Sequence, residues 1–531
     1  MPKVLVGDPI SEEGLKALKE AGGIEVDVKI GLSEDELVKC IGDYDALLVR
    51  SGVKVTAKVL ESANKLKVVG RAGVGVDNVD VPVASKKGII VMNTPGGNTI
   101  STAELTMTLM LGLVRKVGPA YISMRNKQWD RKKFQGVEVF GKTLGIVGLG
   151  RIGTEVAKRA LSFGMKIVAY DPFVSSERAE KMDIEMADLD KLFKVSDIIT
   201  VHTHITKETK GLIGAAAIEK MKKGVFIVNC ARGGIVDETA LLDAVKSGKV
   251  AGAALDVYEN EPPTGSSLLE VDNILLTPHL GASTKEAQEN VAVDVAYQVI
   301  DVLKGGPVRN AVNMPPIDME QLKVLQPHIT LGEKLGNLLA QLVTGQLEEL
   351  KVEYSGEVAG FNVAPITIGV LKGVLGHVIT EPINFINAPI IAKDRGIKIA
   401  ESKLNTPIDF ADLIHVTAIT DGEKKGEVSV AGTLFGKNKD PRVVRINNYH
   451  VDAIPSGFVL IITNEDKPGV VGNVGVILGK NNVNIADMTL GRKGPGSHAV
   501  TVINVDCKVP DKVIEEIRNA PHIVDIKLVE L

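Results

Sequence analysis

Short runs of apolar and β-branched residues alternate with helix-length stretches between residue 1 and about residue 305. Runs of this kind are typical of strands in parallel sheets that helices cover on both faces. Ten runs predict two such sheets rather than one, and therefore two Rossmann-like or flavodoxin-like α/β domains. The runs are KVLVGD (3–8), ALLVR (46–50), LKVVG (66–70), GIIVMN (88–93), TLGIVGLG (143–150), KIVAYD (166–171), DIITVH (197–202), VFIVNCA (225–231), GAALDVY (252–258) and NILLTPH (273–279).

The pattern changes beyond the last of these runs. Ser283 and Glu286 have the spacing of a capping box, which predicts an amphipathic helix that continues to about residue 304. Residues 304–317, KGGPVRNAVNMPPI, are rich in Gly and Pro and predict a linker. Residues 318–452 combine strand and helix patterns, which indicates an α+β domain, but they carry no motif with evident chemistry.

The C-terminal stretch, 453–531, has its own pattern. GFVLIITNEDKPGVVGNVGVILGKNNVNIADMTLGR reads as strand, loop, helix and strand, and the remaining residues add a strand, a helix and a strand. This βαββαβ order is that of a small ferredoxin-like module.

Composition is that of a folded chain with several domains. The 531 residues exceed the length of one ordinary domain, and 44% hydrophobic with 24% charged residues can build real cores. The formal net charge of −4 offers no basic surface for nucleic acid. Cys40, Cys230 and Cys507 lie too far apart in the sequence to indicate a metal site or a disulfide framework, which fits a reducing compartment.

No segment predicts export or membrane insertion. MPKVLVGDPI leads directly into an apolar strand and lacks the anatomy of a signal peptide. The longest apolar stretch, 101–118, carries Glu104, Arg115 and Lys116, so it predicts a buried helix instead of a membrane span. We therefore expect a cytoplasmic protein with no membrane or nucleic-acid partner and no bound metal.

The strongest local motif is KTLGIVGLGRIGTEVAKRA, in which Gly148, Gly150 and Gly153 follow a predicted strand and open a predicted helix. The first glycine makes a tight turn, the second lets backbone approach a pyrophosphate, and the third lets helix pack on strand. Asp171 ends the next strand, 23 residues after Gly148. Its carboxylate accepts hydrogen bonds from ribose hydroxyls and repels a 2′-phosphate, which predicts NAD rather than NADP. The alternative is a purely structural turn.

Three side chains of complementary chemistry stand at the ends of later strands, where doubly wound sheets place their ligands. Arg232 offers a planar cation for a carboxylate. His279 offers the general base that oxidation of an alcohol requires. Glu261 can fix the tautomer of that histidine and support its charged form. Each residue alone has a structural alternative, but together, after a dinucleotide turn, they predict a dehydrogenase acting on a 2-hydroxy acid.

Several motifs carry a family resemblance. GLGRIG, NCARGGIVDETAL, LDVYENEPP and TPHLGAST resemble the D-isomer-specific 2-hydroxyacid dehydrogenases, and VRSGVKVT, GRAGVGVDNVD and WDRKKFQG narrow this to the D-3-phosphoglycerate dehydrogenase branch. The C-terminal βαββαβ module resembles an ACT domain, and residues 318–452 resemble the intervening domain of the long form of that branch. The resemblance implies an active site in the cleft between the first two domains. The implied domains are a substrate-binding domain at 1–97 completed by 285–307, an NAD-binding Rossmann domain at 98–284, an intervening domain at 318–452 and an ACT regulatory domain at 453–531.

The resemblance also implies roles that spacing alone does not single out. Arg50 and Arg131 are expected at the substrate phosphate, Arg131 reaching into a neighbouring subunit, with solvated surface charge as the alternative. Val74 and Gly75 are expected to present backbone N–H groups to the carboxylate and the nicotinamide region. The expected cofactor contacts are Val74, Gly148, Gly150, Arg151, Ile152, Gly153, Asp171, Thr203, Cys230, Ala231, Arg232, Asp256, His279, Gly281 and Ala282. The expected substrate contacts are Arg50, Val74, Gly75, Arg131, Arg232 and His279.

An effector site and an assembly follow from the same resemblance. ACT modules pair with one another and bind amino acids between them. Asn464, Asp466 and Asn484 are expected to hold L-serine, with ordinary loop residues as the alternative. A homotetramer or homodimer is therefore expected.

The resulting expectation is NAD-dependent oxidation of D-3-phosphoglycerate to 3-phosphohydroxypyruvate, the first step of phosphorylated L-serine biosynthesis. His279 takes the hydroxyl proton, Glu261 orients His279, and Arg232 holds the carboxylate. Two alternatives stay open at this point. One is a D-2-hydroxyacid dehydrogenase for another 2-keto acid, such as glyoxylate or 2-oxoglutarate; the other is a dinucleotide-sensing binding protein of the same fold, like the C-terminal-binding-protein corepressors.

Overall fold

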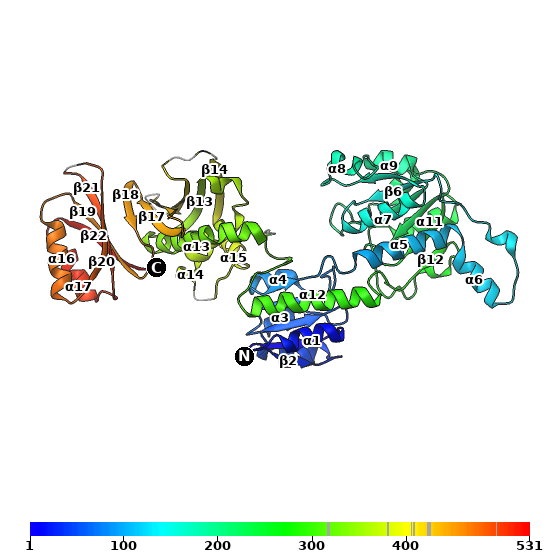
Figure 1. Ribbon diagram of the computed structural model, residues 1–531, viewed down its shortest axis with the longest axis horizontal. Helices are drawn as coiled ribbons and strands as arrows, with labels where there is room; N and C mark the ends of the chain where they lie inside the picture. Colours follow the sequence, from blue (N-terminus) through cyan, green and yellow to red (C-terminus); the bar gives the residue numbers. More distant parts are fainter. Residues whose placement is uncertain (316–318, 380–381, 405, 407–408, 422–425, 495) are drawn as a thin grey trace.

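The computed structural model describes residues 1–315, 319–379, 382–404, 406, 409–421, 426–494 and 496–531. The chain builds four sheets; the fourth lies at one end of the molecule and the second at the other, with the third and the first between them (Figure 1). The expected fold class is confirmed: two parallel α/β sheets, then a mixed sheet, then an antiparallel βαββαβ module. Within the described residues, no helix combines the length and the apolar character needed to cross a bilayer.

The first sheet has five parallel strands with helices on both faces. Its elements are β1 (Lys3–Val6), α1 (Glu12–Glu20), β2 (Glu25–Val28), α2 (Glu34–Cys40), η1 (Ile41–Asp43), β3 (Ala46–Val49), α3 (Ala57–Glu61), β4 (Val68–Arg71), α4 (Val81–Lys86), β5 (Ile90–Met92) and α12 (Lys285–Leu303). The strand order is β2-β1-β3-β4-β5. Helices α2 to α4 cover one face, while α1 and α12 cover the other, where Val295 and Val299 are fully buried. The chain therefore returns to complete the first sheet after it has built the second.

The start of α12 corrects one sequence prediction. Thr284, not Ser283, is the N-cap, and its hydroxyl accepts from the N–H of Ala287 at 3.1 Å. Ser283 belongs instead to the preceding turn, because its N–H donates to the carbonyl of Leu280. The capping box between Ser283 and Glu286 is wrong by one residue, although the helix itself forms.

The second sheet has seven parallel strands. Its elements are α5 (Thr99–Val114), α6 (Val117–Arg125), η2 (Arg131–Phe134), β6 (Thr143–Val147), α7 (Arg151–Ser162), β7 (Lys166–Tyr170), α8 (Ser176–Glu180), β8 (Ile184–Met186), α9 (Leu189–Val195), β9 (Ile198–Val201), α10 (Ala215–Lys220), β10 (Val225–Asn229), α11 (Glu238–Lys246), β11 (Val250–Leu255), η3 (Ser267–Glu270) and β12 (Ile274–Leu276). The order is β12-β11-β10-β9-β6-β7-β8. The chain thus runs outward from β6 in one direction and then from β9 in the other. In such sheets a ligand binds at this switch point, beyond the carboxyl ends of the strands.

The linker predicted at 304–317 is fastened to the first sheet over part of its described length. The side chain of Asn313 accepts from the N–H of Val91 at 3.0 Å and donates to the carbonyl of Ile89 at 2.9 Å. Ala311 forms a β-bridge with Met92. Residues 316 and 317 of this linker lie outside the described residues.

The third sheet is mixed and has six strands. Its elements are α13 (Met319–Leu342), β13 (Gln346–Gly356), η4 (Glu357–Gly360), α14 (Ala364–Val378), α15 (Ala388–Asp394), β14 (Lys398–Leu404), β15 (Asp412–Asp421), β16 (Gly426–Phe435), β17 (Asp440–Ile446) and β18 (Tyr449–Ala453). The order is β14-β13-β15-β16-β17-β18. Helices α13 and α14 approach closely because glycines face the neighbouring backbone: a Cβ at Gly336 would lie 2.1 Å from the carbonyl oxygen of Val370.

The fourth sheet is antiparallel. Its elements are β19 (Phe458–Glu465), α16 (Val470–Lys480), β20 (Ile485–Arg492), β21 (His498–Val505), α17 (Asp511–Arg518) and β22 (Ile523–Glu530), in the strand order β20-β21-β19-β22. One face packs on α16 and α17. The other face, with Val459, Val500 and Val529, joins the core around α13, where Lys334 Nζ donates to the carbonyl of Pro455 at 2.5 Å. The third and fourth sheets therefore share one hydrophobic core.

Candidate active site

The glycine turn between β6 and α7 has the geometry of a dinucleotide cradle. Gly148 has a φ of 96°, and a Cβ there would lie 2.6 Å from the carbonyl oxygen of His202. A Cβ on Gly153 would lie 2.1 Å from the carbonyl oxygen of Gly148, so helix and strand touch at this point. Gly150 caps α7 without a side-chain acceptor, and the space beside it is open. The first amides of α7 are thus left for an anionic ligand.

Asp171 lies directly beneath this turn, at the end of β7. Its Oδ2 accepts from the N–H of Leu149 at 2.8 Å, and its Oδ1 accepts from the N–H of Phe173 at 2.8 Å. Each carboxylate oxygen has a further lone pair. The carboxylate therefore braces the turn and can still accept hydroxyl groups from a ribose.

Three buried polar atoms of the residues that build the second sheet have no hydrogen-bond partner among the described residues: His202 Nδ1 and Thr203 Oγ1, which follow β9, and Asn98 Oδ1, which precedes α5. Native proteins leave few buried polar atoms unpaired, and such atoms call for a ligand or an ordered water. Together with the glycine cradle and Asp171, they fit NAD. Asn98 and His202 were not expected from the sequence as members of this site.

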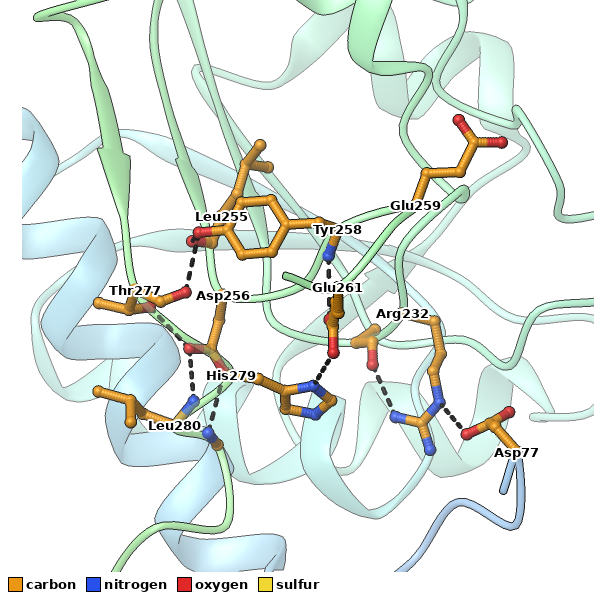
Figure 2. Close-up of polar contacts among 12 residues, drawn as sticks. Asp77, Arg232, Leu255, Asp256, Tyr258, Glu259, Glu261, Thr277, His279 and Leu280 are labelled. Atoms are coloured by element: carbon orange, nitrogen blue, oxygen red, sulfur yellow. Dashed lines mark hydrogen bonds and ion pairs between the residues drawn. The ribbon is translucent and has the colours of Figure 1, made fainter. Parts of the chain in front are cut away.

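The histidine expected from the sequence does meet the expected carboxylate. His279 Nδ1 lies 2.8 Å from Glu261 Oε2, and Glu261 Oε1 accepts from the N–H of Tyr258 at 3.1 Å (Figure 2). The side chain of His279 is 51% exposed, so the ring is open to a ligand. In Figure 2 its second nitrogen, Nε2, makes no contact with the residues drawn. An imidazole held on a carboxylate through Nδ1–H keeps Nε2 free to exchange a proton.

A buried carboxylate shapes the loop that carries His279. Asp256 is fully buried; it accepts from the N–H groups of Leu280 at 2.7 Å and Gly281 at 2.9 Å, and from the hydroxyl of Thr277 at 2.6 Å. His279 itself has a φ of 54°, in the left-handed region. Asp256, expected from the resemblance to line the cofactor, thus holds the Thr277 side chain before the histidine and the backbone after it.

Arg232 reaches the first sheet's side of the site. Its Nε lies 3.5 Å from Asp77 Oδ2, and a Cβ on Gly75 would lie 2.3 Å from its guanidinium (Figure 2). Asp77 is 70% exposed, so this ion pair is weak and can exchange for another carboxylate. The carbonyl of neighbouring Val74 accepts from the Asn93 side chain at 2.5 Å. Residues from both parallel sheets therefore converge here.

Arg71 is a site residue that the sequence reasoning missed. It ends β4, and its guanidinium lies so close to Gly73 that a Cβ there would be 1.7 Å from it. Burial, and then the nearby Arg232, lower the pKa of Arg71, and its buried Nε has no partner among the described residues. Arg50 also contributes to this repulsion. The sequence did contain a signal for Arg71, because this residue ends a strand, as Arg232 follows the end of another.

The remaining cofactor candidates lie around the strand ends and the two loops. Cys230 follows β10 and is buried, and burial raises the pKa of its thiol to about 12. The N–H of Ala231 donates to the Asn229 side chain at 3.0 Å. The carbonyl of Gly281 accepts from the hydroxyls of Ser101 and Thr102. Arg151 and Ile152 open α7, and Ala282 follows Gly281.

Within one chain, Arg131 does not join the substrate site, and the three effector candidates do not form one site. Arg131 is exposed in η2, and no hydrogen bond or ion pair of the described residues joins it to Arg232 or His279. In the fourth sheet, Asn464 pairs with Ala499, next to Asp466 and Arg492, whereas Asn484 precedes β20 at the opposite end, where it donates to Asp506 at 2.6 Å.

Asn464 also turns inward. It is 3% exposed; its Oδ1 accepts from the hydroxyl of Thr501 at 3.0 Å and its Nδ2 donates to the carbonyl of Glu465 at 2.8 Å. Asp466 instead meets Arg492 at 3.4 Å. A site containing all three effector candidates would therefore need more than one chain.

Comparison with known proteins bears on every part of the chain. Residues 107–281 match the model of the D-isomer specific 2-hydroxyacid dehydrogenase NAD binding domain, 324–447 the D-3-phosphoglycerate dehydrogenase intervening domain, and 458–522 the ACT domain. The chain is 47% identical to D-3-phosphoglycerate dehydrogenase of Archaeoglobus fulgidus and 46% identical to that of Methanocaldococcus jannaschii, each over 100% of both chains. A solved glyoxylate reductase from Paecilomyes thermophila is similar at 30% identity and a TM-score of 0.54, covering 59% of this chain and 98% of that one.

Proposed function

Because this chain belongs to the D-3-phosphoglycerate dehydrogenase family, within the D-isomer-specific 2-hydroxyacid dehydrogenases, we propose that Arg232, Glu261 and His279 carry out the reaction of that family in this molecule. The reaction is NAD-dependent oxidation of D-3-phosphoglycerate to 3-phosphohydroxypyruvate, the first step of phosphorylated L-serine biosynthesis. The observation that carries the assignment of residues is the 2.8 Å contact of His279 with Glu261, formed beside Arg232 and the glycine turn.

His279 acts as the proton acceptor. Its Nε2 receives the proton of the substrate hydroxyl while Nδ1–H stays bonded to Glu261, whose negative charge stabilises the imidazolium. Bound NAD would supply the acceptor for the hydride that leaves C2 of the substrate. In the reverse direction His279 returns the proton to the carbonyl oxygen.

Arg232 binds the substrate carboxylate. Its exposed and weak partner Asp77 gives way to that carboxylate, which a planar guanidinium can hold through two parallel hydrogen bonds. The N–H groups of Val74 and Gly75 lie on the same side of the site and add donors. This arrangement holds C2 of the substrate between His279 and the cofactor cradle.

Arg50 and Arg71 supply the phosphate end. Arg71 is a partly buried cation whose buried Nε lacks a partner among the described residues, and Arg50 and Arg232 repel it. An incoming phosphate dianion relieves this repulsion, which favours a phosphorylated substrate over a smaller hydroxy acid. Arg131 of a second copy completes the phosphate site in this proposal.

The arm formed by α6 and η2 supports assembly into a homodimer or homotetramer. Tyr121, Ile122 and Trp129 on this arm are exposed at 64%, 59% and 74%. Exposed apolar groups gathered on one projecting segment mark an association surface. Pairing of ACT modules then brings Asn484 of one chain toward Asp466 of another and forms the site for L-serine, with Asp466 taking the ammonium group.

Substrate preference separates this proposal from its main rival, a dehydrogenase for glyoxylate or another 2-keto acid. We expect kcat/KM for D-3-phosphoglycerate to exceed that for D-glycerate by at least about 100-fold, since each charge-assisted contact to phosphate contributes about 1.5–3 kcal/mol. Arg50→Ala should lower kcat/KM for D-3-phosphoglycerate about 10- to 100-fold and leave kcat/KM for D-glycerate nearly unchanged. Arg309→Ala is the matched control, because Arg309 pairs with Asp301 on the surface of the linker. Equal losses on both substrates would assign Arg50 to the fold or the carboxylate.

A further inference from the structure

His202 holds a hydrogen-bonding atom that nothing in the described chain uses. It follows β9, and its Nε2 lies 3.0 Å from the hydroxyl oxygen of Thr200, which is fully buried. Its Nδ1 is buried without a partner among the described residues. Burial lowers the pKa of His202 to about 4, so the ring is neutral at physiological pH.

The backbone of His202 contacts the end of β6 and the glycine turn, where the cofactor is expected to bind. Its N–H donates to the carbonyl of Val147, the last residue of β6, at 2.7 Å. Its carbonyl oxygen lies against Gly148: a Cβ on Gly148 would be 2.6 Å from this oxygen. Strands β6 and β9 are neighbours at the switch point, so the backbone of His202 and the side chain of Thr203 lie against the glycine turn at the carboxyl edge of the sheet.

A second unpartnered group lies next to it. Thr203 Oγ1 is also buried without a partner in the part of the chain that the structure describes. Two adjacent buried groups left unsatisfied at one strand end are costly, and a ligand that pairs with both removes the cost. The backbone N–H of His202, by contrast, is paired with β6.

The direction of the hydrogen bond with Thr200 decides which ring nitrogen of His202 carries the proton. If the Thr200 hydroxyl donates to Nε2, the ring proton resides on Nδ1, which then becomes a donor. A neutral donor beside the glycine turn suits an oxygen of the ribose–phosphate chain of a dinucleotide. It adds no charge, so the contact does not depend on pH near neutrality.

We propose that His202 is a cofactor-binding residue, whose Nδ1–H donates to an oxygen of the ribose–phosphate chain of NAD beside Gly148, with Thr200 fixing the ring. The inference rests on the proposed NAD-dependent function. The proposed contact is neutral and lies on the side of β6 opposite to Asp171, so it adds to those of the glycine turn and Asp171.

A matched pair of variants tests the proposal in the full-length protein. In His202→Asn the amide nitrogen takes the place of Nδ1 and the contact to Thr200 is lost. In His202→Gln the amide takes the place of Nε2 and the Nδ1 contact is lost. Titration of NADH, followed by its fluorescence, should give a Kd near wild type for the Asn variant and about 10-fold weaker for the Gln variant.

The thermal midpoint of each variant without NADH shows that both fold. A wild-type Kd for both variants overturns the proposal. Weak binding by His202→Asn with retained binding by His202→Gln also overturns it, because His202 then serves only to hold Thr200. Wild-type protein that fails to bind NADH overturns the proposed NAD-dependent function as well, which separates the two failures.

Discussion

At the residue scale, the Asp171 carboxylate has two tasks, since it braces the turn through Leu149 and faces the adenosine ribose of the proposed cofactor. Asp171→Asn removes the charge but keeps one acceptor. We expect the preference for NAD over NADP to fall about 10-fold or more, since like charges in contact cost several kcal/mol. The ratio of kcat/KM values for the two cofactors measures this. A ratio that stays at the wild-type value would show that another group excludes the 2′-phosphate.

Burial of His202 links stability to pH. Its pKa in the folded protein, about 4, lies below the usual 6.5, so the unfolded chain binds its proton first as the pH falls. The stability of the second sheet should therefore drop between pH 6.5 and 4, with a limiting slope of about 1.4 kcal/mol per pH unit from this residue. Above pH 6.5 the residue contributes no slope.

Urea unfolding at pH 7.5 and pH 5, followed through the transition that NADH shifts, tests this expectation. The comparison is with His202→Asn, which cannot titrate. The wild type should lose more stability than the variant on acidification. Parallel losses in both proteins would exclude His202 as the source.

At the element scale, the contact between α13 and α14 depends on glycine. Gly336→Ala places a Cβ 2.1 Å from a backbone carbonyl of α14, so the helices must separate. We expect the free energy of unfolding of this region to fall by about 1–3 kcal/mol. Gly376→Ala, on α14 with no atom within 4 Å of its Cβ, is the control and should stabilise its helix by up to about 1 kcal/mol. Equal effects of the two substitutions, read by urea unfolding, would contradict this account.

The elements that could be predicted from the sequence are those with buried, apolar strands. The ten predicted strands form, but β2, with the sequence EVDV, and β8, with IEM, were missed. Both are edge strands of their sheets, and their alternating or mixed polarity lacks the fully apolar signature. The glycine turn, Arg232, Glu261 and His279 could be located because strand ends and motifs mark them.

Other features of the site depend on side-chain direction, which spacing does not encode. Asn464 lies on the strand expected for it, yet its amide bonds inward to Thr501. Arg71 stands at the carboxyl end of a strand, which the sequence could have indicated, but its proximity to Arg232 became evident only from the structure. The unpaired atoms of His202 and Thr203 are properties of packing and have no sequence signal.

At the scale of the whole molecule, the shared core of the third and fourth sheets decides where the chain can be cut. The cores of the first two sheets contain only residues up to 311. A chain ending at residue 315 should therefore retain turnover with D-3-phosphoglycerate and lose any response to L-serine. Failure of this short chain to bind NADH would show that the catalytic half needs the rest.

A chain ending at residue 453 provides the contrast. It lacks the fourth sheet, so it exposes the α13 face that Val459, Val500 and Val529 cover in the full protein. We expect it to bind a hydrophobic dye more strongly than the full-length chain or the short one, and to aggregate on storage. Dye binding equal to that of the full-length chain would mean that the third sheet buries this face by itself.

Helix α12 has a consequence for synthesis on the ribosome. The first sheet has all five strands once residue 92 has been made, but only α1 covers one of its faces until residues 285–303 bring Val291, Val295 and Val299. At about 5–20 residues per second the delay is roughly 10 to 40 s. Throughout that interval the part of this face that α12 later covers stays exposed while the second sheet folds. The first segment to emerge is thus among the last in the catalytic half to be finished, and it is the natural client of a chaperone that binds nascent chains.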